Sequence, residues 1–209
     1  MRTALFRTLS LAGLLAVAAP ALADTMGSDA QQIRFVVHGG LTMGGDNLST
    51  VQTDDGKDKI KAGGLFQVGA GILAQAGTLP LAAQLTYNYH ADGDSYENGS
   101  TSYHRQPIEL TFFYTGIENW RLGAGVRKSG SAKFNVKQDG YATVRGTLES
   151  DPALILEAGY ALSPSAWLSA RYVDESYTLK SASVGNASIQ GLNEKVDASH
   201  AGVFITFAF

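Results

Sequence analysis

Two glutamates and four arginines are the residues of this chain that could do chemistry together. Glu109 and Glu157 each stand on the polar face of an alternating apolar and polar run. Two facing carboxylates are what glycoside hydrolysis requires, but such a pair needs an open substrate cleft. The corresponding polar faces of other runs carry the four arginines, Arg34, Arg121, Arg127 and Arg171. We expect the six side chains to form structural ion pairs, because buried charges at low dielectric must be paired.

The histidines are the next candidates for catalysis or metal binding. The four of them, His38, His90, His104 and His200, lie in different runs, and no Ser-His spacing typical of lipid A acylases or deacylases is present. The segment 92–96 begins like a calcium loop, but Tyr96 stands at the third ligand position. We therefore expect hydrogen-bonding histidines, with no catalytic residue, metal or cofactor.

Eight alternating runs position these side chains. Period-two alternation indicates strands with one apolar face, and 24 glycines with only five prolines favour a β-rich chain with many turns. The expected strands are 33–41, 60–74, 81–90, 104–115, 120–127, 153–162, 166–179 and 200–209.

The connections between these strands alternate in length. Long polar connections, expected to be loops, occupy 44–59, 91–103, 131–150 and 180–196, and short turns separate the other strands. Both ends of the strand array and all the short turns then lie at one end, with the four long loops at the other. This is the arrangement of transmembrane β-barrels.

The last strand needs a partner, because an exposed aromatic edge invites aggregation. Pairing with the first strand closes the sheet and leaves no edge. In lipid the outward face must be apolar, since an arginine at mid-bilayer costs about 2 to 4 kcal/mol. The charged faces must then line a narrow lumen, where glycines leave room for large side chains. The fold class is thus an all-β, eight-stranded antiparallel up-and-down transmembrane β-barrel, whose bore has no space for a hydrolytic cleft.

Aromatic residues stand near both ends of the expected strands, where two interfacial girdles would form. The alternative is ordinary cross-strand packing. The girdle residues are Phe35, Tyr114, Trp120 and Tyr160 at the turn end, and Tyr87, Tyr89, Tyr103, Phe134 and Tyr172 at the loop end.

The N-terminal segment is typical of a secretory signal peptide. Two arginines precede a short apolar run that ends in Ala21-Leu22-Ala23. A membrane anchor is the alternative, but the run is too short to span a bilayer. The expected domains are a signal peptide at 1–23 and a barrel at 24–209. The net charge of −3 argues against nucleic acid as a partner, and the absence of cysteine excludes disulfides.

Together these features resemble the small outer-membrane barrels of the OmpA transmembrane-domain and OmpX kind. The residues that carry the resemblance include an alternating C-terminal strand with Val203, Ile205, Phe207 and Phe209 on one face. The resemblance implies that these four side chains are the signal for the barrel-assembly machinery. It also implies a location in the outer membrane of a Gram-negative bacterium. The chain ends with the eighth strand, so no peptidoglycan-binding domain is expected.

The expected function is non-enzymatic. We expect a monomer with a closed lumen and a structural or interaction role at the cell surface, in contact with outer-membrane lipid and lipopolysaccharide. Two alternatives remain open at the sequence level. One is a narrow channel for small or apolar solutes, and the other is a lipid A-modifying enzyme.

Overall fold

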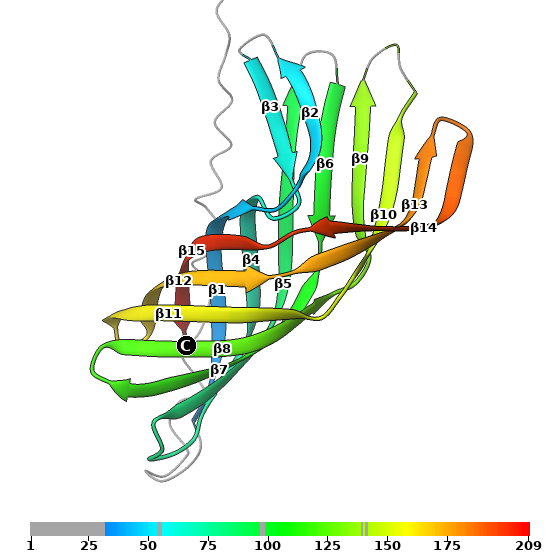
Figure 1. Ribbon diagram of the computed structural model, residues 1–209. Helices are drawn as coiled ribbons and strands as arrows, with labels where there is room; N and C mark the ends of the chain where they lie inside the picture. Colours follow the sequence, from blue (N-terminus) through cyan, green and yellow to red (C-terminus); the bar gives the residue numbers. More distant parts are fainter. Residues whose placement is uncertain (1–31, 54–55, 97–98, 139, 141) are drawn as a thin grey trace, which may run out of the picture.

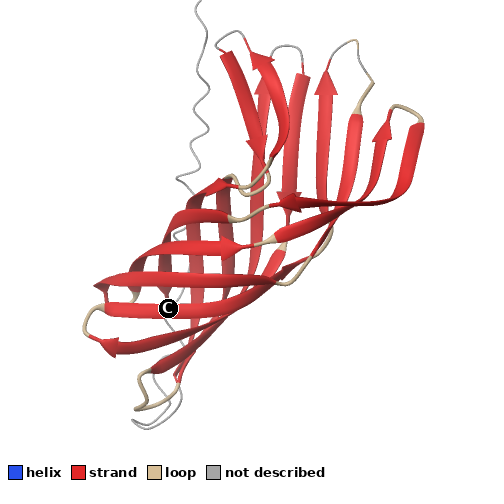
Figure 2. Cartoon of the chain, in the orientation of Figure 1, coloured by secondary structure: helices blue, strands red, loops and turns tan. Residues whose placement is uncertain are grey.

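The computed structural model describes residues 32–53, 56–96, 99–138, 140 and 142–209. Within these ranges the regular structure consists of β-strands (Figures 1 and 2). No helix in this part of the chain is long and apolar enough to cross a membrane. The predicted signal peptide, residues 1–23, lies outside the described residues.

Eight strands close into an antiparallel up-and-down barrel, as the sequence predicts. Each strand pairs with the next along the chain, and the register Val36↔Ala208 between the first and last strands closes the ladder. No barrel edge is therefore left unpaired. The strands are β1 (Gln32–Gly44), β4 (Leu65–Gln75), β5 (Leu81–Tyr96), β7 (Pro107–Ile117), β8 (Trp120–Ser129), β11 (Ala153–Ser163), β12 (Ala166–Asp174) and β15 (His200–Ala208).

The predicted long loops are largely strands, which corrects the sequence-based expectation. The end of β5 continues into a sheet, called the upper sheet below, whose other members are β6 (Gly99–Arg105), β9 (Ala132–Gln138), β10 (Val144–Ser150), β13 (Ser176–Val184) and β14 (Ala187–Asp197). A separate hairpin is formed by β2 (Asn47–Thr53) and β3 (Gly56–Lys61). These segments escaped detection because a strand outside the membrane can be polar on both faces, which removes the alternation.

The barrel strands bend where they enter the upper sheet. In Figure 1, β7, β8 and β11 cross the lower part of the molecule, whereas β6, β9 and β10 rise steeply above them. The breaks fall at Gln106, at Gly130-Ser131, at Asp151-Pro152 and at Glu175. Proline cannot donate to a ladder, so Pro152 is a natural place for pairing to stop.

The barrel is apolar outside and charged inside, the reverse of a soluble domain. Leu41 is 68% exposed and Leu154 is 61% exposed, whereas Glu109 and Arg127 are only 1% and 2% exposed. Apolar side chains face outward on all eight strands. This polarity matches a wall in contact with lipid.

Glycines in the lumen leave room for large neighbours. A Cβ atom added at Gly40 would lie 2.6 Å from the ring of Phe204 and would also clash with the backbone oxygen of Val203. At Gly159 an added Cβ would lie 2.8 Å from Nε of Arg121. These glycines therefore provide the space that the arginine side chains and aromatic rings occupy in the bore.

We predict that Gly40→Ala lowers the free energy of unfolding by about 1 to 3 kcal/mol, because overpacking forces Phe204 and the backbone to move. The adjacent change Gly39→Ala is the control, since its Cβ would meet Val68 at an ordinary 3.6 Å. Urea unfolding of the purified barrel in lipid vesicles measures both. Equal stability of the two variants would contradict this packing argument.

Candidate functional site

An unbroken chain of ion pairs runs through the lumen. Arginine and glutamate alternate along it, with each carboxylate between two guanidinium groups. The members in order are Arg121, Glu157, Arg171, Glu109, Arg127, Glu175 and Arg105, and the successive N–O distances are 2.8, 2.7, 2.9, 3.3, 3.4 and 3.4 Å. All seven side chains are at most 3% exposed. The bore is thus filled by paired charges, four guanidinium groups and three carboxylates.

Strand register brings two of these pairs together. Glu157 lies directly opposite Arg171 in the β11–β12 ladder, and Glu109 lies opposite Arg127 in the β7–β8 ladder. Directly opposed side chains on one face of a sheet are close enough to interact. The link between Arg171 and Glu109 then crosses the bore from β12 to β7.

Further hydrogen bonds hold the carboxylates in place. Arg171 donates from Nε and Nη2 to one oxygen of Glu157, at 2.9 and 2.7 Å. Gln67 donates from Nε2 to Glu109 at 2.9 Å, and Tyr177 donates its hydroxyl to Glu175 at 2.7 Å. All three carboxylates are therefore occupied by fixed donors, and neither Glu109 nor Glu157 is placed as a free acid or nucleophile.

Three of the four histidines line the lumen, each beside an arginine. Arg105 approaches Nδ1 of His90 at 2.9 Å and Arg127 approaches Nε2 of His200 at 3.3 Å. Because arginine only donates, these ring nitrogens must accept. The opposite nitrogens then donate to the backbone oxygens of Gly64, at 3.0 Å, and Ala198, at 2.8 Å. This pattern of hydrogen bonds assigns a single neutral tautomer to His90 and to His200.

The third lumen histidine is His38, and the fourth histidine, His104, lies outside the lumen. His38 pairs with Asn88 through Nε2 and lies 3.5 Å from Arg171 through Nδ1. His104 faces outward and stacks on Tyr89, with ring centroids 6.3 Å apart. Among the described residues no group of three histidine, aspartate or glutamate side chains could hold a metal ion.

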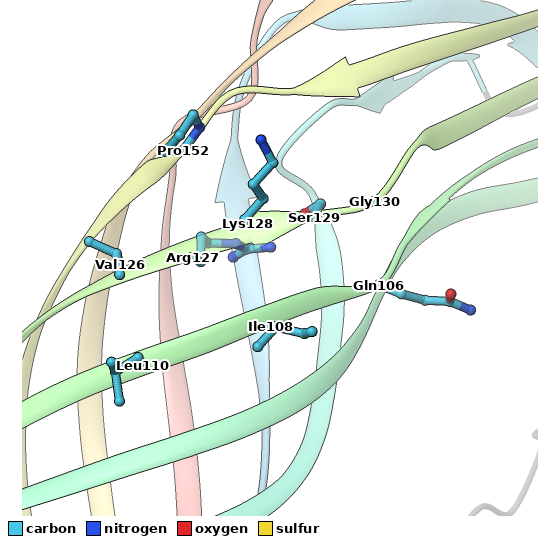
Figure 3. A pocket seen from close by; sticks show the side chains of 9 residues that line it. All are labelled: Gln106, Ile108, Leu110, Val126, Arg127, Lys128, Ser129, Gly130 and Pro152. Carbon is cyan, nitrogen blue, oxygen red and sulfur yellow. The ribbon is translucent and has the colours of Figure 1, made fainter.

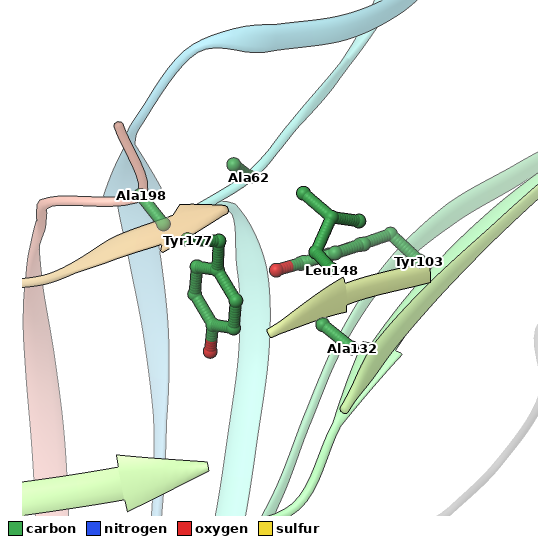
Figure 4. Close-up of a cluster of buried hydrophobic side chains, with 6 residues drawn as sticks. All are labelled: Ala62, Tyr103, Ala132, Leu148, Tyr177 and Ala198. Atoms are coloured by element: carbon green, nitrogen blue, oxygen red, sulfur yellow. The ribbon is translucent and has the colours of Figure 1, made fainter. Parts of the chain in front are cut away.

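Apolar clusters close the charged chain at both ends. At the turn end, Phe113 and Trp167 cover the guanidinium of Arg121, whose carbon lies 4.5 and 4.8 Å from their ring centroids. At the opposite end, Tyr103, Leu148 and Tyr177 pack together above the mouth of the barrel with three alanines (Figure 4). We call the second group the upper cluster; its alanines are Ala62, Ala132 and Ala198.

The structure brings five of the six predicted lumen residues into the ion-pair chain. Arg34 lies outside it, at the turn end, where it donates to the Pro164 oxygen at 3.2 Å and lies 5.5 Å from the Trp167 ring. Sequence reasoning missed Arg105 and Glu175. Arg105 keeps the inward parity of Glu109, and Glu175 keeps that of Arg171, so extending the alternation beyond the ends of β7 and β12 would have found both.

Two predicted girdle residues are wrong. Tyr103 is 2% exposed in the upper cluster, because it shares the inward parity of Arg105 and Glu109. Phe134 packs against the same cluster, because the inward parity switches at Gly130-Ser131 between Ser129 and Ala132. The other seven residues face outward and are 40–66% exposed, namely Phe35, Tyr87, Tyr89, Tyr114, Trp120, Tyr160 and Tyr172.

The C-terminal strand places its alternate residues as the pattern suggests. Val203, Ile205, Phe207 and Phe209 all face outward and are 39–57% exposed. Phe204, the residue that breaks the polar face of this strand, points inward. Its ring lies 4.4 Å from the guanidinium carbon of Arg171, a cation–π contact within the lumen.

Comparisons with known proteins give structural likenesses only. No protein-family model matches the sequence, and no curated protein is significantly similar to it. Neisserial surface protein A has a TM-score of 0.46 and 9% identity, over 85% of this chain and 97% of that one. The outer membrane protein AlkL has a TM-score of 0.45 and 14% identity, over 93% and 97%. OmpT, an outer membrane protein of Vibrio cholerae, has a TM-score of 0.27 and 16% identity, over 84% and 52%. Because these scores are low, the fold assignment depends on the closed ladder and inverted polarity of the barrel itself.

We predict that Glu109→Ala lowers the free energy of unfolding by about 3 to 5 kcal/mol, because it leaves Arg127 and Arg171 buried without one of their partners. Glu149→Ala is the control, since Glu149 is 66% exposed and pairs with Lys180 only at 3.5 Å. Its loss should change stability by at most about 0.5 kcal/mol. Denaturant unfolding in vesicles measures both, and an unchanged Glu109→Ala barrel would refute a stabilising role for the chain.

Proposed function

We propose that this protein resides in a bacterial outer membrane as a plugged, monomeric barrel with a structural or interaction role at the cell surface. The observation that carries the proposal is the chain of seven buried charges between two apolar clusters. A continuous aqueous path would have to separate pairs that are held at 2.7–3.4 Å.

The location is supported by the polarity of the wall. Outer-membrane barrels carry an outward apolar band with aromatic residues at both interfaces. Here apolar side chains face outward on all eight strands, and outward aromatic residues occur at both ends of the barrel. The short turns at 76–80, 118–119 and 164–165 lie at one end, and the upper sheet lies at the other. By the usual orientation of such barrels, the upper sheet faces the outside of the cell.

The proposed biogenesis involves a signal peptide at 1–23 and recognition by the barrel-assembly machinery. The proposed recognition signal consists of the outward side chains of β15 together with Phe209, which follows this strand. They are suited to this role because they remain on the surface of the strand that closes the barrel, where a partner can contact them before closure.

We predict that the reconstituted barrel shows no steady open steps in planar lipid bilayers. The physical reason is the cost of separating buried charges from their partners. Heat-modifiable gel mobility of the same preparation verifies that the barrel is folded. Steady conductance from folded protein would contradict the plugged lumen and favour the alternative function, a narrow channel.

We predict that Phe209→Ala reduces the amount of folded protein recovered in outer-membrane fractions. Phe35→Ala is the matched control, because Phe35 is 66% exposed, faces lipid at the same end and lies on the neighbouring strand, β1. It removes the same ring without altering the terminal signal. The readout is the heat-modifiable fraction on gels, and an equal loss for both variants would show that general lipid contact, rather than recognition, explains the effect.

A further inference from the structure

The strand pairing of the barrel wall is interrupted on one side at the level where the strands bend, where Ser129 N–H donates to Ser150 Oγ at 3.3 Å. The β8–β11 ladder ends at Arg127↔Ala153, and pairing resumes above it at Ala132↔Leu148 between β9 and β10. Residues 128–131 and 149–152 have no strand pairing with each other across this gap. The bend described above thus leaves an interruption in an otherwise continuous wall.

A notch of about 470 Å³ lies at this interruption (Figure 3). Its walls come from the start of β7, the end of β8 and the residue before β11. Apolar side chains dominate the surface next to lipid. The lining residues are Gln106, Ile108, Leu110, Val126, Arg127, Lys128, Ser129, Gly130 and Pro152.

Gly130 lines the notch and faces open space. A Cβ atom added there would meet nothing within 4 Å, and Gly130 is not among the glycines with positive φ. Ile108 and Val126 beside it are 55% and 51% exposed on the lipid-facing side. An apolar chain of the bilayer that lies in the notch would cover these two side chains.

Positive charge lies at the edge of the same notch. Figure 3 shows Lys128 extending from β8 on the side where Pro152 lies. The carboxylate of Asp151 interacts electrostatically with Lys128 and also bonds to Lys195 and Ser176, at 2.9 Å each, so two lysines share one carboxylate. The hydrogen bonds from Lys195 and Ser176 keep the pKa of Asp151 below its usual value, so it stays ionised and paired.

One further exposed cation follows Lys128 along the chain. Lys133 is the next exposed cation along the chain, on β9 of the upper sheet. Arg127 forms the inner wall, but its side chain is buried and paired with Glu109 and Glu175 in the ion-pair chain, so it adds no free charge to the notch. The notch therefore combines an apolar slot at membrane depth with cations where a lipid headgroup would lie.

We propose that the notch binds one lipopolysaccharide molecule of the outer leaflet, with an acyl chain in the slot and a phosphate on Lys128. The inference rests on the proposed outer-membrane location. Lipopolysaccharide fits better than a phospholipid because the cations continue from Lys128 to Lys133, into the region above the membrane where its phosphorylated sugars lie. Juxtamembrane cations attract anionic lipid by about 1 kcal/mol each.

The test is lipid retention by the full-length mature protein in detergent, measured by native mass spectrometry. The probes are a deep-rough lipopolysaccharide and phosphatidylglycerol of matched chain length. Wild-type protein should retain one lipopolysaccharide in preference to phosphatidylglycerol. Lys128→Gln should weaken retention roughly fivefold, and Gly130→Phe, which fills the slot, should weaken it about tenfold.

Two matched controls accompany these variants. Lys180→Gln removes the same charge from β13, and Ala170→Phe adds the same ring to the outward face of β12. Both should bind like the wild type. Equal retention of the two lipids, or equal effects of notch and control variants, overturns the proposed site.

Heat-modifiable mobility separates this result from the proposed function. A wild-type barrel that is heat-modifiable but retains no lipopolysaccharide overturns the notch proposal alone. A wild-type protein without heat-modifiable mobility would instead overturn the outer-membrane barrel on which the notch proposal rests.

Discussion

Closure of the hydrogen-bond ladder between β1 and β15 is the constraint on which the rest of this structure depends. Hydrocarbon cannot satisfy backbone amides and carbonyls, so a sheet that spans lipid must have no edge. The pairing from Val36↔Ala208 to Gly44↔His200 provides this closure. Once the sheet is closed, period-two geometry sends alternate side chains to lipid and to the lumen. The charged side chains of the barrel strands must then point into the lumen.

Confinement in a narrow bore explains the composition of the lumen. Each buried guanidinium needs a carboxylate, and each large side chain needs a gap beside it. Arg121 illustrates both needs, because it pairs with Glu157 at 2.8 Å and occupies the space left by Gly159. Phe113 and Trp167 then cover its guanidinium faces. The contacts that pair the buried charges therefore also fill the space inside the barrel.

The rim of the barrel follows a different rule, because water is available there to satisfy polar groups. Strands can bend, stop pairing and resume, as they do between Arg127↔Ala153 and Ala132↔Leu148. The upper sheet keeps the strand order of the barrel and covers the mouth with Tyr103, Leu148 and Tyr177. The interruption that permits this bend also creates the apolar notch beside Lys128.

The alternation in the sequence was enough to predict the eight barrel strands and the inward face of most lumen charges, because period two is a local property of the chain. Glu109 and Arg171 could be assigned to the lumen in this way. It did not determine which charges meet, since partners depend on register and on the strands across the bore. The three-dimensional arrangement was needed to find the Arg105–Glu175 pair, the inward Tyr103 and Phe134, and the strands of the upper sheet. Outside lipid both faces of a strand can be polar, so strands there lack the alternation by which they could be predicted. They can be recognised only from their pairing in the folded protein.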